Sequence, residues 1–327
     1  MELRNRGICA GQCPPQRLGT NGRILRRDYW AGFTQLRSNG IGKDNLMLSH
    51  ILNSLLCPIC GADLTLTLDG QTVRCSNGHD FDVSRYGYVN LLSGKQVSKT
   101  DTGPMVEARE AFFRSGHYRS LSDLLAGYGD QLLTDVDGGC IVDIGGGTGH
   151  YLAAMLERQP ERLGVVLDAS KYAARRAARA HPRIGAVVAD AWQRLPIRDS
   201  SAALVLNVFA PRNGPEFQRI LRRDGALVVV TPNPRHLQEL VAELGMLSVD
   251  DRKEARLSEQ LGPYFELIDT QVHDRAMHLS HDEIAALIGM GPSAWHSDVN
   301  ELRQKIDSLS EPSTATLSVT VSAYRPV

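Results

Sequence analysis

A buried strand that leads through a glycine-rich turn into a helix restricts the fold of this chain more than any other feature. Residues 141–150 read Ile-Val-Asp-Ile-Gly-Gly-Gly-Thr-Gly-His, and the residues from 148 to 158 have the apolar spacing of a helix. Glycines at such a turn let the backbone adopt positive φ and approach a ligand at the N-terminus of the helix. The segment therefore predicts an α/β fold with a ligand site beside this turn.

Short apolar runs and helical stretches alternate after this turn. We expect strands at 164–168, 186–190, 203–207 and 226–230, and helices at 171–180 and 216–222. Runs that are apolar at almost every position are typical of strands buried on both faces, so the pattern predicts a mostly parallel sheet covered by helices. Leu317, Val319 and Val321 alternate with polar residues, which predicts an antiparallel strand at the edge of that sheet.

The rest of the chain divides by composition. Residues 1–46 are rich in arginine and lack periodicity, so we expect a disordered extension, and a chain that begins at Met47 should still fold. Residues 47–92 form a compact module rich in cysteine and histidine. A polar linker and a helical region follow at 93–135, with helices expected from Pro104 and from Ser120, and the α/β domain occupies 136–327.

Composition is that of a soluble globular protein. Hydrophobic residues make up 42% and charged residues 22% of the 327 residues, and the net charge is −1. Contact with nucleic acid would therefore have to use local basic patches. No apolar run approaches the ~18 residues that a membrane-spanning helix requires, and the beginning of the chain lacks the pattern of a secretory signal. We expect no membrane contact and a cytoplasmic location.

Four candidate metal ligands flank a predicted β-hairpin, whose strands are expected at 64–68 and 72–74 around an Asp-Gly turn. The four ligands are Cys57, Cys60, Cys75 and His79. Thiolates and an imidazole at this spacing suit tetrahedral zinc, and four protein ligands leave no open position, so the metal should be structural. The alternative is a set of buried free cysteines with a surface histidine. Cys9 and Cys13 lack a second pair nearby and stay unassigned.

The glycine-rich turn differs from the dinucleotide-binding fingerprint G-x-G-x-x-G, which would need glycine where His150 stands. The spacing here is Gly-x-Gly-x-Gly after Asp143, with the glycines at Gly145, Gly147 and Gly149. Asp168 ends the second strand, where it can accept hydrogen bonds from a ribose diol, and Asp190 ends the third, where it can meet an adenine amino group. Two spaced acids after such a turn predict an S-adenosylmethionine site. Alternatively, both acids cap the helices that follow.

The segment from Asn207 to Asn213 follows the fourth strand and should face the methyl acceptor, because ligands of open α/β sheets bind at the carboxyl ends of the strands. An ordinary strand-to-helix turn is the alternative. His236 follows the fifth strand in a loop with two prolines, at the same end of the sheet. We expect it to touch cofactor or substrate, and the alternative is a lone histidine without a role in the site.

The helix after Asp168 carries a cationic face, formed by Lys171, Arg175, Arg176 and Arg179. A solvated helix face is the usual explanation of such a run. Because a zinc hairpin and the basic residues Arg85, Lys95 and Lys99 occur in the same chain, we favour contact with phosphate groups.

Motifs from about Met47 to Val327 resemble those of the RlmA family of 23S rRNA (guanine-N1)-methyltransferases, and within it the tylosin-resistance branch. The motifs are CPIC, RCSNGHDFDVSRYGYVNLL, AFFRSGHYRSL, VDIGGGTGH, NVFAPRN, TPNPRHLQEL, MGPSAWH and LSVTVSAYRP. The resemblance implies a Rossmann-like class I methyltransferase domain, a zinc module that recognises a hairpin in domain II of 23S rRNA, and a homodimer. The implied activity is S-adenosylmethionine-dependent methylation of N1 of a guanine in that hairpin, guanine 748, which gives resistance to tylosin-type macrolides.

The resemblance also implies individual site residues. Contacts to S-adenosylmethionine carry over to Tyr118, Gly147, Thr148, Gly149 and His236, and zinc ligation to Cys57, Cys60, Cys75 and His79. Guanine N1 bears a proton on the Watson–Crick edge, so its methylation needs an unpaired or extruded base and loss of that proton. We expect Asn207 to orient the guanine, and Asp190 or a water to accept the proton.

Two other classes of protein stay open. A small-molecule methyltransferase would share the fold without needing a zinc module or a cationic helix. A noncatalytic zinc-dependent RNA-binding protein would not need the intact glycine-rich turn with both acids.

Overall fold

The computed structural model describes residues 43–92, 100–244, 253–291 and 299–327, which belong to one compact unit. The expected extension before residue 43 lies outside the described residues, as do Cys9, Cys13, Lys95 and Lys99. The first described helix begins at Lys43, so the boundary expected after residue 46 falls inside a helix.

The described helices are α2 (Lys43–Ile51), α3 (Gly103–Ser115), α4 (Arg119–Leu132), α5 (His150–Arg158), α6 (Lys171–Ala180), α7 (Gly214–Ile220), α8 (Gln238–Leu244), α9 (Lys253–Leu261), α10 (His281–Gly289) and α11 (Val299–Asp307), with a 3₁₀ helix η1 (Leu52–Ser54). The strands are β1 (Leu64–Leu66), β2 (Thr72–Cys75), β3 (Asp80–Asp82), β4 (Tyr88–Asn90), β5 (Cys140–Ile144), β6 (Gly164–Asp168), β7 (Ile184–Val188), β8 (Ala202–Val208), β9 (Leu221–Pro232), β10 (Phe265–Leu279) and β11 (Ser313–Pro326). None of these helices is both long and apolar enough to cross a membrane.

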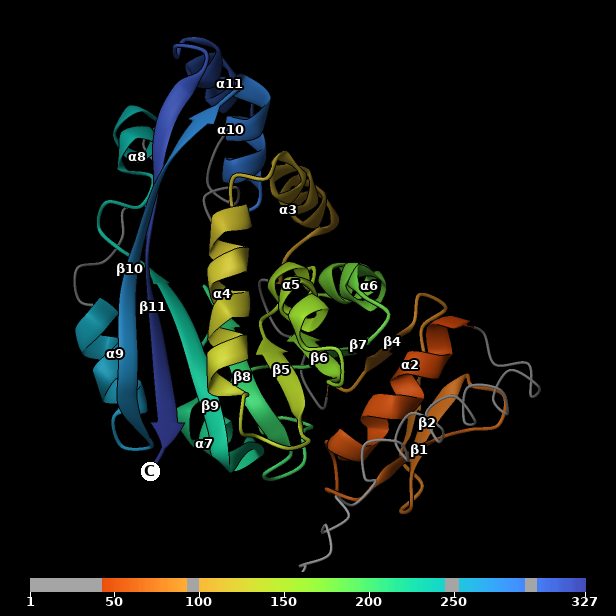
Figure 1. Ribbon diagram of the computed structural model, residues 1–327. Coiled ribbons are helices and arrows are strands. Elements are labelled where there is room, and N and C mark those ends of the chain that lie inside the picture. The colour runs from red at the N-terminus through yellow and green to blue at the C-terminus, as the bar shows by residue number, and fades with distance from the viewer. Residues whose placement is uncertain (1–42, 93–99, 245–252, 292–298) are drawn as a thin grey trace, which may run out of the picture. The chain divides into compact units, whose positions relative to one another are not determined.

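Eight strands form one sheet in the order β10-β11-β9-β8-β5-β6-β7-β4 (Figure 1). β5 pairs in parallel with both β6 and β8, and β4 pairs in parallel with β7 at one edge. The strand order reverses at β5, and ligands of open α/β sheets bind beside this point, at the carboxyl ends of the strands. The glycine-rich turn follows β5, so the predicted mostly parallel sheet places it where a ligand is expected.

Helices cover both faces of the sheet. Along β5, Ile141 packs into one hydrophobic core and Val142 into the other, because successive side chains of a strand point to opposite faces. The first core includes Leu125 of α4 and Met155 of α5, and the second includes Phe217 of α7. Figure 1 shows α4 and α5 on the face of the sheet turned toward the viewer. Burial on both faces explains the nearly continuous apolar runs of these strands.

The antiparallel strand predicted at residues 317–322 exists, but its expected position at the sheet edge is wrong. β11 contains these residues and lies between β9 and β10, antiparallel to both. The edge strand is β10, which the sequence pattern did not predict. Its side chains from Glu266 to Val272 are exposed on both faces, so the stretch lacks the apolar alternation that marks a half-buried strand.

The cysteine- and histidine-rich module is built into the α/β unit. β1, β2 and β3 form a small antiparallel sheet, and the predicted hairpin turns at Gly70, whose φ is +69°. Arg198, which precedes β8, pairs with Asp63 of the module at 2.6 Å. β4 lies within the range 47–92 assigned to the module and is itself a strand of the large sheet. The module is therefore joined to the sheet by backbone pairing.

Local signals explain where α3 and α6 begin. The side chain of Thr102 accepts a hydrogen bond from the backbone N–H of Met105, and proline occupies the first turn of α3. Gly116 ends this helix at φ +85°, where a left-handed residue closes the last turn. Ser170 caps α6 by accepting from the N–H of Ala173. These caps set the first residues of α3 and α6, and α6 follows closely on the carboxyl end of β6.

Candidate functional site

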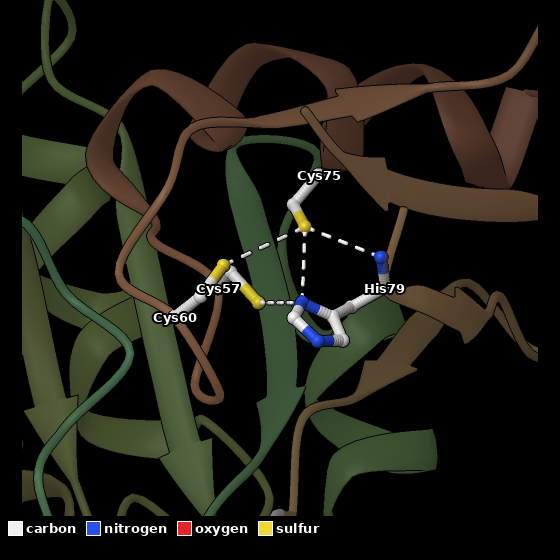
Figure 2. Close-up of side chains that lie close together, drawn as sticks. All are labelled: Cys57, Cys60, Cys75 and His79. Atoms are coloured by element: carbon white, nitrogen blue, oxygen red, sulfur yellow. Dashed lines mark hydrogen bonds between the residues drawn. The ribbon is translucent and has the colours of Figure 1, made fainter. Parts of the chain in front are cut away.

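The four predicted zinc ligands converge on one point. The ligand atoms of Cys57, Cys60, Cys75 and His79 all lie within 4.8 Å of one another (Figure 2). The Sγ atoms of Cys60 and Cys75 are 3.7 Å apart, and the Nδ1 atom of His79 lies 3.3 Å from the Sγ atom of Cys75 and 3.6 Å from that of Cys57. The predicted ligand set is confirmed as a spatial cluster.

These separations match the edges of a tetrahedral zinc site. Zn–S bonds of about 2.3 Å and Zn–N bonds of about 2.0 Å give tetrahedral edges of about 3.8 Å between sulfurs and about 3.5 Å between sulfur and nitrogen. A disulfide between Cys60 and Cys75 would need a sulfur separation of about 2.0 Å, and both thiols are free. The residues therefore fit Zn²⁺, which they would hold through three sulfurs and Nδ1 of His79, with no position left for a reacting water.

Two similar turns present the ligands. Gly61 and Gly78 adopt φ of +73° and +84°, and their N–H groups donate to the carbonyl oxygens of Cys57 and Cys75 at 2.8 and 3.0 Å. Glycine is required at both positions because a side chain disfavours positive φ. The backbone N–H of Ala62 donates to the Cys60 sulfur and lowers the pKa of this thiol from 9.0 to about 6. The turn thus favours the thiolate form that binds metal.

The second site is the glycine-rich turn between β5 and α5. Gly145, Gly147 and Gly149 adopt φ of +69°, +56° and +77°, as expected of a turn that only glycine enters without strain. A Cβ atom at Gly145 would lie 2.5 Å from Cβ of Ala210, and one at Gly147 would lie 3.1 Å from the Arg109 guanidinium. The turn is therefore narrow on both sides, and added side chains would fill it.

Asp168 closes one side of this turn. Its carboxylate accepts hydrogen bonds from the N–H groups of Gly147 at 2.9 Å and Ser170 at 2.8 Å. Burial raises the pKa of Asp168, while these two N–H donors lower it. The acid thus joins the glycine-rich turn to the residue before α6, and the helix cap that the alternative explanation assigned to Asp168 is Ser170. Contact of Asp168 with a ribose stays a prediction.

Asp143 lies beneath the turn as a buried acid without a partner. It is 0% exposed, and neither carboxylate oxygen has a hydrogen-bond partner. Burial raises its pKa to about 8, and the charge of Asp168 adds to the effect. Buried polar groups are normally paired, so an orphaned carboxylate beside a ligand-binding turn indicates a missing partner. Two neighbouring acids indicate that this partner is a cation.

Arg109 of α3 is a residue of this site that no sequence pattern predicted. Its guanidinium lies against Gly147, forms an ion pair with Asp101 and donates to the carbonyl oxygen of Met290 at 2.9 Å. Ser170 donates to the carbonyl oxygen of Asp101 at 2.6 Å, which fastens the segment before α3 to the end of β6. No motif marks an isolated arginine on a helix, so only the packing of α3 reveals its place in the site.

The predicted acceptor loop touches the glycine-rich turn. Asn207 is fully buried, and its Nδ2 atom donates to the carbonyl oxygens of Ile144 at 3.3 Å and Pro211 at 2.9 Å. Phe209 is 43% exposed, has a left-handed φ of +54° and stacks on His236 with ring centroids 5.9 Å apart. A left-handed aromatic residue is strained, and such strain concentrates at functional sites. The exposed ring of Phe209 is therefore the candidate substrate contact of this loop.

The remaining predicted site residues lie around this centre. Tyr118 precedes α4 and is buried edge-on against Phe112, with ring centroids 5.1 Å apart. Thr148 is buried within the turn. Asp190 follows β7, next to the end of β6, and accepts a hydrogen bond from the N–H of Trp192 at 2.9 Å. Within the described residues, neither Tyr118 nor Asp190 forms a hydrogen bond with the glycine-rich turn, and their contact with the cofactor stays a prediction.

The residues of this centre fit S-adenosylmethionine. The molecule carries a positive sulfonium and a positive ammonium group, which suit the unpaired carboxylate of Asp143 and the neighbouring Asp168. The positive-φ glycines leave space at the N-terminus of α5 that a side chain would take. The Asp143 carboxylate, Asp168 and the backbone of the turn would hold the cofactor.

Known proteins resemble this chain over most of its length. The zinc-ribbon family described as "RlmA, N-terminal" matches residues 55–97. The 23S rRNA (guanine(748)-N(1))-methyltransferase of Streptomyces fradiae is 49% identical over 281 residues, which cover 86% of this chain and 100% of that protein. A putative 23S rRNA (guanine-N(1)-)-methyltransferase of Micromonospora griseorubida is 46% identical, with the same coverage of 86% and 100%.

Solved structures also align with part of this chain. An S-adenosylmethionine-dependent methyltransferase from Thiobacillus denitrificans in complex with S-adenosyl-L-homocysteine covers 62% of this chain and 90% of its own, with 16% identity and a TM-score of 0.41. The 49% identity extends over the complete Streptomyces fradiae relative and includes the zinc ribbon. This chain therefore belongs to the RlmA family of 23S rRNA (guanine-N1)-methyltransferases.

Proposed function

We propose that this protein methylates N1 of a guanine in 23S rRNA with S-adenosylmethionine as donor, at guanine 748 as the name of the Streptomyces fradiae relative states. One observation carries the proposal: a closed four-ligand metal cluster and a glycine-rich turn with an orphaned acid occur in a single compact unit. A small-molecule methyltransferase has no need of the first feature, and a noncatalytic RNA-binding protein has no need of the second.

Positioning supplies most of the catalysis in this mechanism. The bound cofactor supplies an activated methyl group on its sulfonium sulfur. Asp143 and Asp168 line the turn. Burial raises the pKa of Asp143 to about 8, so this acid holds a proton near neutral pH in the cofactor-free protein, and the positive groups of the cofactor would favour its charged form. Asn207 acts as a positioning residue because it is buried and ties the acceptor loop to the carbonyl oxygen of Ile144. Phe209 offers an exposed ring on which an extruded guanine stacks.

Transfer to guanine N1 also requires removal of its proton. Asp190 is half-buried at the carboxyl end of the sheet and acts as the acceptor, either directly or through one water. Only one oxygen of its carboxylate receives the Trp192 N–H, which leaves lone pairs for the incoming proton. His236 supports the ring of Phe209 from the neighbouring loop.

The proposal extends to the partners and to the biological result. The zinc module contacts the rRNA hairpin, two copies of the chain form the RNA-binding cleft, and the modified rRNA protects cytoplasmic ribosomes from tylosin-type macrolides. Light scattering of the purified protein tests the dimer. Tylosin susceptibility of a sensitive bacterium that expresses the chain tests the resistance.

Methyl transfer to rRNA is the decisive experiment. Purified protein is incubated with labelled S-adenosylmethionine and unmodified 23S rRNA, and the product is mapped by reverse transcription, because a methyl group on N1 blocks base pairing. We expect label in the RNA and a new stop at one guanine. Label that enters only small acceptors, or cofactor binding without any transfer, would show that the proposal is wrong.

A further inference from the structure

Three arginines surround one tyrosine ring between the zinc module and α6. The guanidinium carbon of Arg175 lies 3.8 Å from the centroid of the Tyr86 ring, and those of Arg85 and Arg179 lie at 4.9 and 5.3 Å. Arg85 also donates to the Tyr86 hydroxyl at 2.8 Å. We call these four residues the Tyr86 cluster. A tyrosine face attracts cations, so this ring holds the three charges in fixed positions.

Within the described residues, the positive charge of this cluster is not compensated. Arg85, Arg175 and Arg179 have no carboxylate partner there, and the buried Nε atom of Arg175 has no hydrogen-bond partner. Arg176 of the same helix differs, because it pairs with Glu110 at 3.3 Å. Like charges this close repel one another. Since the net charge of the whole chain is −1, the cluster is a local concentration of charge that suits an anionic ligand.

The cluster is continuous with the cofactor edge of the sheet. Lys171, Arg175 and Arg179 are spaced at i, i+4 and i+8, so they share one face of α6 over about 12 Å. α6 begins directly after Asp168 and Ser170, which contact the glycine-rich turn and Asp101. Beside Lys171, the ring of Tyr172 is 45% exposed. A polyanion bound along this face would therefore extend toward the methyl-transfer site.

We infer that α6 and the Tyr86 cluster bind the phosphodiester backbone of the substrate RNA next to the methylated guanine. The inference rests on the proposed function and adds a second contact surface to it, separate from the zinc ligands. Guanidinium groups bind phosphates with paired N–H donors. Exposed aromatic rings, here Tyr172 and the 59% exposed Trp192, stack on unpaired bases. This combination fits a single-stranded or looped RNA.

The test measures binding of full-length protein to a 23S rRNA transcript over a series of KCl concentrations. The double variant Arg175→Gln/Arg179→Gln should weaken binding about tenfold near ~100 mM KCl, and the slope of log Kd against log[KCl] should fall by about 1.4 to 1.8, because each lost phosphate contact removes about 0.7 to 0.9. Affinity for S-adenosylmethionine and zinc content should not change.

The control removes two exposed arginines that belong to α5 and α11. Arg158 and Arg303 are 51% and 49% exposed and pair with acids of their own. Arg158→Gln/Arg303→Gln should retain the wild-type salt slope, since net charge alone does not set it.

A second pair of variants tests the ring of Tyr86. Tyr86→Leu should raise KM for RNA with little change in kcat, and Tyr86→Phe should restore most of the affinity.

Each outcome decides the question. If the wild-type protein methylates rRNA and the Arg175/Arg179 variant keeps the wild-type salt slope, the assignment of RNA binding to this surface is wrong and the proposed function stands. If both double variants lose slope equally, the effect is one of net charge and the surface is again wrong. Weaker binding to phosphatidylglycerol vesicles with unchanged RNA binding would reassign the cluster to a membrane and overturn the inference. A wild-type protein that transfers no methyl group to rRNA would remove the proposed function and this inference together.

Discussion

Gly146 lies so close to Asp143 that a Cβ atom at residue 146 would stand 2.6 Å from the carboxyl carbon of that acid. Gly146 does not adopt positive φ, so space and not backbone strain requires the glycine. Gly146→Ala should therefore displace the Asp143 side chain, destabilise the fold by about 1 to 3 kcal/mol and weaken S-adenosylmethionine binding. Thermal unfolding and calorimetry measure the two effects.

Gly127→Ala is the matched control, because nothing lies within 4 Å of a Cβ atom at that position of α4. Alanine in a helix is more stable than glycine by about 0.5 to 1 kcal/mol, so this variant should be slightly more stable and should bind cofactor normally. If Gly146→Ala behaved like Gly127→Ala, the close packing of the turn on Asp143 would affect neither stability nor cofactor binding.

The buried Asp143 predicts a pH-dependent stability. Burial raises its pKa to about 8, so between about pH 4 and pH 8 the folded protein keeps a proton that the unfolded chain has lost. Stability without cofactor should therefore fall as pH rises, by roughly 3 kcal/mol between about pH 5 and pH 8 from this group. Asp143→Asn should flatten the dependence and increase stability at about pH 8.

Chemical denaturation of cofactor-free protein at several pH values checks this prediction. Asp143→Asn should also lose affinity for S-adenosylmethionine, because the amide offers no negative charge to a cation. If the free energy of unfolding changed with pH in the same way for the wild type and Asp143→Asn, burial would not hold this acid neutral.

Sequence patterns predict the strands of this fold that are buried on both faces. β5 and β6 are buried on both faces, so their apolar runs are visible without knowledge of the partners. β4 spans only Tyr88–Asn90 and is too short to show a period. β10 is exposed from Glu266 to Val272 and became a strand through pairing with β11, whose residues lie about 50 positions later. Pairing with a distant segment leaves no local signal.

The same distinction applies to the sites. The zinc ligands are predictable because both ligand pairs lie in short turns whose glycines are part of the motif. Arg109 reaches the glycine-rich turn from a helix 38 positions before Gly147, through the packing of α3, and no pattern predicts it. The burial of Asn207 was not predictable from the sequence either, because a polar residue at a strand end usually faces solvent.

Loss of one zinc ligand should separate the metal site from the cofactor site. Cys75→Ser removes a ligand of the closed cluster, so zinc content should fall from about one per chain to near zero, and the β1–β2 hairpin should loosen. Cofactor binding should be retained because the glycine-rich turn belongs to other strands, whereas rRNA methylation should fall sharply. Metal analysis, calorimetry and the methylation assay give the three readings.

Cys140→Ala is the control for Cys75→Ser. Cys140 is a buried free thiol on β5 and is not part of the metal cluster, so this variant should keep its zinc. Purified wild-type protein without stoichiometric zinc, or Cys75→Ser that retains it, would contradict the assignment.

The strained Phe209 should affect activity much more than stability. Glycine adopts the φ of +54° without a steric penalty, so Phe209→Gly should relieve strain of about 1 kcal/mol, which offsets part of the packing lost between the ring and His236. The same change removes the ring on which the guanine stacks, so KM for rRNA should rise about tenfold or more, since base stacking contributes about 1 to 3 kcal/mol. Ser200, at φ +50°, lies away from the acceptor loop, and Ser200→Gly should gain stability while methylation stays at the wild-type rate. Equal methylation by the two glycine variants would show that Phe209 does not contact the substrate.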